Sequence, residues 1–426
     1  MRLNPFRAIR PVPALAATIA APPYDVVSRP EAAALARDNP LSFLHVGRAE
    51  IDLPDTVDPY DPRVYAAARM RLDRLVSEGA LIRDDRPALY LYREVMAGRA
   101  QTGVVGGVHV DDYEADVIRK HERTRPDKED DRTRHLLALE AHAEPVLLLY
   151  RGRPELDRLV AAATAAAPLY DFTTADGVAH TVWRLSAPAP YQRIFDGVAR
   201  AYVADGHHRS AAAWRAAREL RARNPGHTGD LEYNWFPAVL VPAEQLRILA
   251  YNRVVTDLAG RTPEEVLAEL GRLGRLAVTD EPVPPRPGAF CIYLDGGWHR
   301  LDLAADSIDR SDPIRALDVS LLQERLLGPV LGIADQRTDK RIDFVGGIRG
   351  TRALAARVDA GEAALAVSLH PTTVEQLMAV ADAGQVMPPK STWFEPKLLS
   401  GLFVHPLPPR ALTYPPVYVD PGVPLQ

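Results

Sequence analysis

Short apolar runs that suit buried strands alternate with helical segments along most of this 426-residue chain. An alternation of this kind predicts an α/β fold of mixed (α+β) character, in which helices flank mixed sheets. It also predicts one hairpin, because two strand-like runs flank the turn Met96–Arg99. The runs that we expect to form strands are residues 88–95, 102–110, 145–150, 178–183, 201–204, 236–241 and 363–369.

Several helix boundaries are indicated by particular side chains. Residues 62–78 have apolar side chains at helical spacing, and Gly79 follows them as a suitable residue for a left-handed helix end. Another helix is expected to begin at Pro126 and to continue to His142, since proline is tolerated in the first turn of a helix. Capping boxes, in which a hydroxyl residue precedes a glutamate by three positions, are expected at Ser28–Glu31, Thr262–Glu265 and Thr372–Glu375.

The length predicts two or three domains, at roughly 100–200 residues for each. We place a domain boundary near residues 257–263. Residues 1–257 are then an N-terminal α/β domain, and residues 258–426 are a C-terminal α/β domain. The second domain ends in a Pro-rich tail after Pro406, which we expect to lie on the surface.

Composition excludes several classes of protein. A net charge of −5 provides no global basic field, so nucleic acid is not an expected partner. The single cysteine, Cys291, excludes an internal disulfide and a cysteine-based zinc site, and it lies in an apolar run that predicts a buried thiol. No run of about 18 apolar residues is present, so no membrane partner is expected. We expect a cytoplasmic protein, for which a homo-oligomer remains open.

The segment most suggestive of chemistry is Ala201–Arg209, which is followed by an Ala-rich helix. It indicates a strand, a tight turn at Gly206 and a helix whose first residues are His207, His208 and Arg209. A helix N-terminus has unpaired N–H groups and the positive end of the helix dipole, so it favours an anion such as phosphate. The alternative is structural: the histidines cap neighbouring carbonyls, and Arg209 forms a surface ion pair.

A second segment, residues 119–135, mixes many charges of both signs. Its carboxylates are candidate ligands for a hard divalent cation, and its basic side chains are candidate phosphate contacts. The alternative is a solvated helix with many ion pairs. A composite site requires this segment to meet the Asp205–Arg209 turn in space.

Two further segments are ambiguous. Met387–Lys397 contains two lysines, two hydroxyl residues and two aromatic residues between prolines, so it is either a binding loop or a docked segment that fills core space. Ala21–Val27 presents Tyr24 and Asp25 after two prolines, which is more typical of a structural turn. The sequence contains no P-loop, no Gly-x-Gly-x-x-Gly after a strand, no Gly-x-Ser-x-Gly and no His-Glu-x-x-His.

Five blocks spread over nearly the whole chain together resemble the bacterial and archaeal family called domain of unknown function 1015. The family name carries no established activity. The blocks are Ala21–Val27, Asn39–Val46, Lys120–Arg132, Ala204–Arg209 and Met387–Thr392.

The Asp205-Gly206-His207-His208-Arg209 block is also similar to the phosphate-contacting turn of the ParB/sulfiredoxin superfamily, and to the corresponding block of its free-serine kinases. This resemblance implies a ParB/sulfiredoxin-like nucleotide-binding part. It also implies phosphate contact at the two histidines and the arginine, and a metal or catalytic role for Asp205. The other acidic residue of those kinases has no aligned counterpart in this sequence.

The leading hypothesis is a phosphotransferase, a nucleotide-dependent kinase whose partners are a nucleotide and a small hydroxylated metabolite such as free serine. Its cofactors are ATP or ADP and Mg²⁺. Alternatives are a non-catalytic nucleotide- or phosphate-binding regulatory protein, a phosphate-ester hydrolase at the same pocket, and, disfavoured by the acidic charge, a ParB-like nucleic-acid protein. The candidate residues are Asp205, Glu122 and Asp127 for catalysis; Gly206, His207, His208 and Arg209, then Lys128, Arg132 and Lys390, for phosphate; and Asp205, Glu129 and Asp131 for metal.

Overall fold

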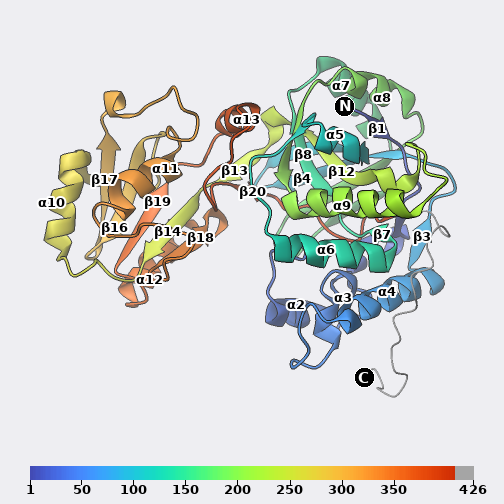
Figure 1. The fold of residues 1–426 in the computed structure, drawn as a ribbon, viewed down its shortest axis with the longest axis horizontal. Coiled ribbons are helices and arrows are strands. Elements are labelled where there is room, and N and C mark those ends of the chain that lie inside the picture. Colours follow the sequence, from blue (N-terminus) through green and yellow to red (C-terminus); the bar gives the residue numbers. More distant parts are fainter. Residues whose placement is uncertain (408–426) are drawn as a thin grey trace. The chain divides into compact units, whose positions relative to one another are not determined.

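The computed structural model describes residues 1–407 and divides the chain into two compact units. Unit 1 contains Met1–Leu246 together with the segment that begins at Pro396, and unit 2 contains Arg247–Glu395 (Figure 1). Unit 2 is therefore an insertion into unit 1. The Pro-rich tail that we expect on the surface lies, from residue 408 onward, outside the described residues.

The division differs from the expected boundary near residues 257–263 because two distant strands pair at the base of unit 2. β13 (Arg247–Leu249) runs antiparallel to β20 (Trp393–Glu395), with Arg247 opposite Glu395. The chain enters and leaves unit 2 at this ribbon. Residues from Pro396 onward consequently belong with the N-terminal unit, which local sequence patterns do not indicate.

Unit 1 is built on a sheet that has nine strands within the described residues. The order is β6-β11-β8-β12-β5-β4-β10-β9, and β1 pairs with β5. The pairs β6–β11 and β8–β12 are parallel and the others are antiparallel, so the predicted mixed sheet is confirmed. The strands of this sheet are β1 (Leu3–Asn4), β4 (Leu89–Met96), β5 (Arg99–His109), β6 (Ile118–Arg119), β8 (Val146–Tyr150), β9 (Tyr170–Thr173), β10 (Ala179–Leu185), β11 (Ala201–Asp205) and β12 (Trp235–Pro242).

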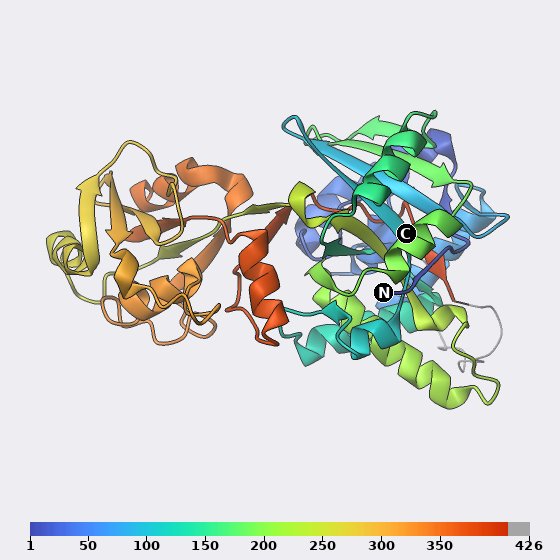
Figure 2. The same ribbon diagram turned by 90° about the horizontal axis from the view of Figure 1, so that it is seen from above.

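The predicted hairpin is present as β4 and β5, the long light-blue pair in Figure 2. Ala97 and Gly98 connect the strands with φ values of 50° and 75°. Positive φ at both central residues is what a tight two-residue hairpin turn needs. Smaller antiparallel pairs in unit 1 join β2 (Ile9–Pro11) to β3 (Leu81–Arg83) and β7 (Ala141–His142) to β21 (His405–Pro406).

Helices cover the unit 1 sheet, and three of them, α9, α6 and α4, lie one beside the next (Figure 1). Apolar side chains join α6 to α9, among them Leu136, Leu137, Ala216 and Leu220. The helices of unit 1 are α1 (Ala16–Ile19), α2 (Arg29–Ala36), α3 (Leu44–Gly47), α4 (Pro62–Ser77), α5 (Val110–Glu114), α6 (Pro126–Leu139), α7 (Pro154–Thr164), α8 (Ala189–Asp196) and α9 (His207–Arg223).

Unit 2 has an antiparallel sheet of the order β15-β17-β16-β19-β14-β18, six strands in the part of the chain that the structure describes. Helix α10 packs against β15 and β17, and α12 packs against β16 and β19. Cys291 is fully buried in β16, as predicted, and burial raises its pKa to about 11. The elements are β14 (Tyr251–Val255), β15 (Gly274–Val278), β16 (Ala289–Leu294), β17 (Gly297–Leu303), β18 (Ile342–Gly346), β19 (Leu365–Leu369), α10 (Pro263–Leu273), α11 (Asp318–Leu322), α12 (Gly350–Asp359) and α13 (Val374–Asp382).

Two predicted helix ends are shifted. The capping box of α13 is formed by Thr373 and Gln376, one residue after the expected Thr372 and Glu375, and the Thr372 hydroxyl instead donates to the Ser391 carbonyl. Helix α6 ends at Leu139, because Glu140 adopts a left-handed conformation with φ 49° and β7 begins directly after it. The expected capping boxes at the start of α2 and α10 are confirmed. Within residues 1–407, no helix has both the length and the apolar composition needed to cross a bilayer.

Candidate functional site

Two loops meet at one edge of the unit 1 sheet because the strands before them are parallel neighbours. In β6 and β11, Ile118 lies opposite Ala201. The carboxyl ends of adjacent parallel strands lie at the same edge of a sheet, so the chain after β6 and the turn after β11 come together. The first loop carries His121 and Glu122, and the second begins at Asp205. The structure thus joins the two charged segments that a composite site requires.

Gly206 forms the turn between β11 and α9. Its φ of 97° and ψ of 33° are left-handed, a conformation that glycine adopts without steric cost. A Cβ atom at this position would lie 3.0 Å from Val146 Cγ1 and 3.1 Å from Arg209 Nε. Both the backbone conformation and the available space therefore favour glycine, and the turn leaves the first N–H groups of α9 without intrahelical acceptors.

Asp205 lies between two cations at the end of β11. Its Oδ2 atom is 3.3 Å from Arg209 Nη2 and 3.7 Å from Lys397 Nζ. Burial by itself raises the pKa of Asp205, but the charges of Lys397 and Arg209 outweigh this effect and lower the pKa to about 2. The Asp205 carboxylate is consequently ionised at every physiological pH.

Arg209 is buried behind the turn and already has partners. Its Nη1 atom donates to the Pro145 carbonyl and lies 3.9 Å from Glu144 Oε2. Burial disfavours the charged guanidinium, but Asp205, Asp25 and Glu144 more than compensate and raise the pKa of Arg209. A cavity of about 40 Å³ is lined by Arg209 and Glu144 among other residues. This cavity has room for a few water molecules and is far smaller than a nucleotide.

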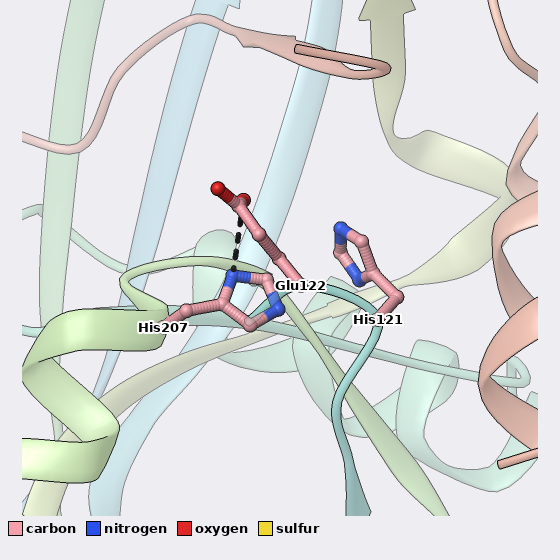
Figure 3. Close-up of side chains that lie close together, drawn as sticks. All are labelled: His121, Glu122 and His207. Atoms are coloured by element: carbon pink, nitrogen blue, oxygen red, sulfur yellow. Dashed lines mark ion pairs between the residues drawn. The ribbon is translucent and has the colours of Figure 1, made fainter. Parts of the chain in front are cut away.

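His207 begins α9 and faces the loop after β6. Its Nδ1 atom lies 3.8 Å from Glu122 Oε2, and its ring stands at 88° to the ring of His121, with 4.5 Å between the centroids. Figure 3 shows the Glu122 carboxylate directed at the His207 ring, with the His121 ring beside them. Both imidazoles are buried, whereas the Glu122 side chain is half exposed.

Burial keeps both imidazoles of this group neutral. It lowers the pKa of His121 to about 4, with only a partial offset from the Val203 carbonyl and from Asp205. Burial also lowers the pKa of His207 well below its usual value, and the neighbouring His121 adds to that effect. At neutral pH the contact between His207 and Glu122 is therefore a contact between a neutral ring and a carboxylate.

His208 ties the first turn of α9 to the loop before α6. Its Nε2 atom accepts a hydrogen bond of 3.1 Å from the backbone N–H of Arg125. Burial lowers the pKa of His208, although the nearby carboxylate of Asp25 opposes that change. Asp127, a predicted catalytic residue, forms an exposed ion pair of 2.8 Å with Arg125.

The three carboxylates predicted to bind a metal are each paired with a different cation. Asp205 contacts Arg209 as described above, Glu129 lies 3.3 Å from an Arg215 nitrogen, and Asp131 lies 2.8 Å from an Arg132 nitrogen. Their side chains do not form a shared group within the described residues.

Lys128 and Arg132, which the sequence predicts as additional phosphate contacts, also have partners within the protein. The Lys128 ammonium donates a hydrogen bond of 2.8 Å to the Tyr60 hydroxyl. The Arg132 guanidinium lies 4.0 Å from the centroid of the Tyr24 ring, a cation–π contact that places α6 against the Ala21–Val27 turn.

Lys390 belongs to unit 2, where its ammonium lies 5.4 Å from the centroid of the Tyr251 ring. In the same segment, Phe394 is buried in β20, so this aromatic side chain fills core space. Lys397, at the end of the segment, belongs to unit 1 and contacts Asp205.

One group of side chains has the proximity that metal coordination requires. Among residues 1–407, only His121, Glu122 and His207 bring three or more His, Cys, Asp or Glu ligand atoms together, all within 4.8 Å of one another. Mg²⁺ prefers oxygen ligands, which at this edge of the sheet are the carboxylates of Asp205 and Glu122. The two imidazoles instead suit a transition metal.

Local sequence patterns assign no individual role to His121, Glu144 or Lys397. His121 carried a usable signal: like His207, it follows a strand-like run and lies shortly before a helix. Glu144 and Lys397 carried none, because their contacts with Arg209 and Asp205 join segments that are distant in the chain.

Comparisons with known proteins give a family match and several similar structures. The model of the family described as "Protein of unknown function (DUF1015)" matches residues 3–320. No curated protein matches. The chain is similar to SbnI with a C-terminal truncation from Staphylococcus aureus, at 14% identity and a TM-score of 0.37, covering 71% of this chain and 87% of that one.

Two other solved structures are similar to this chain at 13% identity. A free serine kinase in complex with AMP has a TM-score of 0.34 and covers 71% of this chain and 91% of its own. A conserved hypothetical protein from Pyrococcus furiosus has a TM-score of 0.31 and covers 68% of this chain and 90% of its own.

Proposed function

The chain belongs to the family described as protein of unknown function (DUF1015), and we propose that it is a phosphotransferase, a nucleotide-dependent kinase of a small hydroxylated metabolite such as free serine. One observation carries the proposal. The left-handed turn at Gly206 opens α9 beside an ionised aspartate, and the Glu122 carboxylate reaches to 3.8 Å from the first residue of that helix. Donors for phosphate and carboxylates for a metal or a proton therefore lie at one place.

Phosphate binding is assigned to the start of α9. The N–H groups of its first turn and the positive end of its dipole favour a polyphosphate. His207, His208 and Arg209 stand at this turn, as in the similar block of the free-serine kinases. Arg209 contributes positive charge from behind the turn, because its guanidinium is buried against Asp205 and Glu144.

The carboxylates divide the remaining roles. Asp205 is the assigned Mg²⁺ ligand, because an ionised oxygen donor suits a hard cation. When bound, Mg²⁺ supplies charge neutralisation on the transferring phosphoryl group. The substrate hydroxyl oxygen forms the new P–O bond, its proton passes to a carboxylate, and the bond to the leaving ADP (AMP, when ADP is the donor) breaks. The proton acceptor is half-exposed Glu122 or exposed Asp127, and Asp25, whose charge acts on His208 and Arg209, is a further candidate.

The direct test is turnover by the full-length protein. Mg²⁺-ATP or Mg²⁺-ADP is supplied with serine, and then with a pool of hydroxylated metabolites, and the phosphorylated product is identified by mass spectrometry. Asp205→Asn is expected to lower turnover by about 100-fold or more, the effect typical of losing a preorganised electrostatic contact. Asp196→Asn, at an exposed residue that ends α8, is the matched control and keeps full turnover.

The products separate the kinase from its alternatives. Free phosphate without a phosphorylated metabolite identifies a hydrolase. Thermal stabilisation by nucleotide without any turnover identifies a binding protein. If neither nucleotide is consumed with any metabolite, the kinase proposal is wrong.

A further inference from the structure

The group formed by His121, Glu122 and His207 contains buried polar atoms that the surrounding protein does not satisfy. Both ring nitrogens of His121 and the Nε2 atom of His207 are buried and make no well-formed hydrogen bond in the described part of the chain, although the Val203 carbonyl interacts weakly with the His121 ring. The two residues are 2% and 5% exposed. Unpartnered buried polar atoms cost free energy, so native proteins rarely keep them without a ligand, an ion or a functional reason.

The group is also prepared to act as a ligand set. An imidazole binds a metal through a ring nitrogen lone pair, and the unpartnered nitrogens of His121 and His207 are available for that role. The ligand atoms of the three side chains all lie within 4.8 Å of one another. A tetrahedral Zn²⁺ site with bonds of about 2.0–2.1 Å separates its ligand atoms by roughly 3.4 Å, so the widest pair of ligand atoms must approach by at most about 1.4 Å for binding. Of the three ligands, Glu122 is the one whose side chain is half exposed.

We propose that His121, Glu122 and His207 bind one divalent transition-metal ion such as Zn²⁺, with a further position open to water or to an oxygen of a bound ligand. Two imidazoles and one carboxylate form a ligand set that holds zinc or non-haem iron and leaves coordination positions open. Mg²⁺ is excluded from this group by its preference for oxygen ligands.

The fold supplies these ligands from two neighbouring loops. His121 and Glu122 follow β6, His207 follows β11, and the two strands are parallel partners. Parallel pairing fixes the distance between the loops before any ion binds. With Glu122 committed to the metal, Asp127 or Asp25 is left as the acceptor of the substrate proton, an assignment that rests on the proposed kinase function.

The test is metal binding by the full-length, tag-free protein after EDTA treatment. Zn²⁺ is titrated in competition with a chromophoric chelator, and Co²⁺ is added separately to record the visible bands of a nitrogen- and oxygen-ligated ion. We expect one site per chain. His121→Gln, Glu122→Gln and His207→Gln should each weaken Zn²⁺ binding by at least about 100-fold, more than the loss of an outer-shell partner.

Two controls keep the outcome interpretable. His227→Gln removes an exposed imidazole that contacts Tyr233 and should leave Zn²⁺ affinity unchanged. Since substitution of a buried histidine can impair folding, Glu122→Gln carries the test alone if the His variants unfold, as judged by circular dichroism in EDTA. Wild-type-like Zn²⁺ binding by Glu122→Gln, or no specific binding by the wild type, overturns the metal site.

The Zn²⁺-binding measurement uses no nucleotide. The metal site and the kinase function can therefore be disproved independently of each other. Absence of phosphorylated product with Zn²⁺ bound at these residues contradicts the kinase and leaves the metal site standing. Turnover with Mg²⁺-ATP by a wild-type protein that shows no specific Zn²⁺ binding contradicts the metal site and leaves the kinase standing.

Discussion

At the scale of single residues, the site depends on a glycine that no other residue replaces without strain. Gly206→Ala should destabilise the protein by about 2–3 kcal/mol, because a left-handed alanine costs roughly 1–2 kcal/mol and its Cβ atom also presses on Val146 and on the Arg209 side chain. Chemical denaturation measures the loss. Displacement of the Arg209 side chain should also weaken the proposed nucleotide binding.

Gly177→Ala is the matched control for this substitution. Gly177 also has a left-handed conformation, with φ 82°, but the space around its Cβ position is open. Gly177→Ala should lose only the backbone part of this stability, roughly 1–2 kcal/mol, and should keep the proposed nucleotide binding. Equal losses in the two variants would show that the contacts around Gly206 contribute nothing.

A buried carboxyl in unit 2 makes stability depend on pH. Asp318 accepts a hydrogen bond of 2.8 Å from the Gly288 N–H through Oδ1, and burial raises its pKa to about 7. Between about pH 4 and pH 7 the folded protein therefore holds a proton on Asp318 that the unfolded chain has lost, so the contribution of Asp318 to stability falls as pH rises through that window. The change approaches about 4 kcal/mol, at 1.36 kcal/mol per pKa unit. The buried histidines contribute with the opposite sign, because their lowered pKa values favour the folded state as pH rises.

Asp318→Asn removes this titration. Urea denaturation between pH 4 and pH 8 should show a free energy of unfolding that rises more steeply with pH than in the wild type, because the falling contribution of Asp318 no longer offsets the rising contribution of the buried histidines. Asp306→Asn, at an exposed aspartate of the same unit, should retain the wild-type slope. A wild-type slope in Asp318→Asn would mean that Asp318 ionises normally in the folded state.

At the scale of secondary-structure elements, the position of a helix cap is testable by neighbouring substitutions. The structure places Gln376, not Glu375, at the third position of α13, where its side chain accepts a hydrogen bond of 3.0 Å from the Thr373 N–H. Gln376→Ala should therefore cost about 0.5–1 kcal/mol, within the range measured for capping interactions. Glu375→Ala should cost less, because exposed Glu375 contributes only through the helix dipole. Thermal unfolding of both variants tests this assignment. A larger loss of stability in Glu375→Ala than in Gln376→Ala would contradict a capping box at Thr373 and Gln376.

Many of the helices and strands can be predicted from local sequence. The N-terminal cap of α13 is a feature that local sequence does not determine. Capping boxes, the hairpin and most strands follow from side chains a few residues apart. Two successive threonines make Thr372 and Thr373 equally good caps, and the choice is made by the contact of the Thr372 hydroxyl with Ser391, far along the chain. The end of α6 is likewise set by the pairing of β7 with β21.

At the scale of the whole molecule, the candidate site depends on strand pairings that local patterns do not contain. The turn at Asp205–Arg209 was predictable because strand, glycine and helix follow one another in the sequence. The proximity of this turn to His121 and Glu122 was not predictable, because it depends on the parallel pairing of β11 with the two-residue strand β6. Neither the Lys397 contact nor the insertion of unit 2 has a local signal.

The insertion of unit 2 leads to a prediction about the independence of unit 1. Arg247 and Glu395 are opposite each other in an antiparallel pair, so the two ends of the insertion lie roughly 5 Å apart. Replacing residues 247–395 with a short Gly/Ser linker should therefore close the chain at little entropic cost and leave unit 1 folded. All three proposed zinc ligands belong to unit 1, so the shortened protein should bind Zn²⁺ with wild-type affinity in the chelator competition. A shortened protein that is folded but no longer binds Zn²⁺ would show that unit 2 is needed to shape the metal site, and an unfolded one would show that the two units fold together.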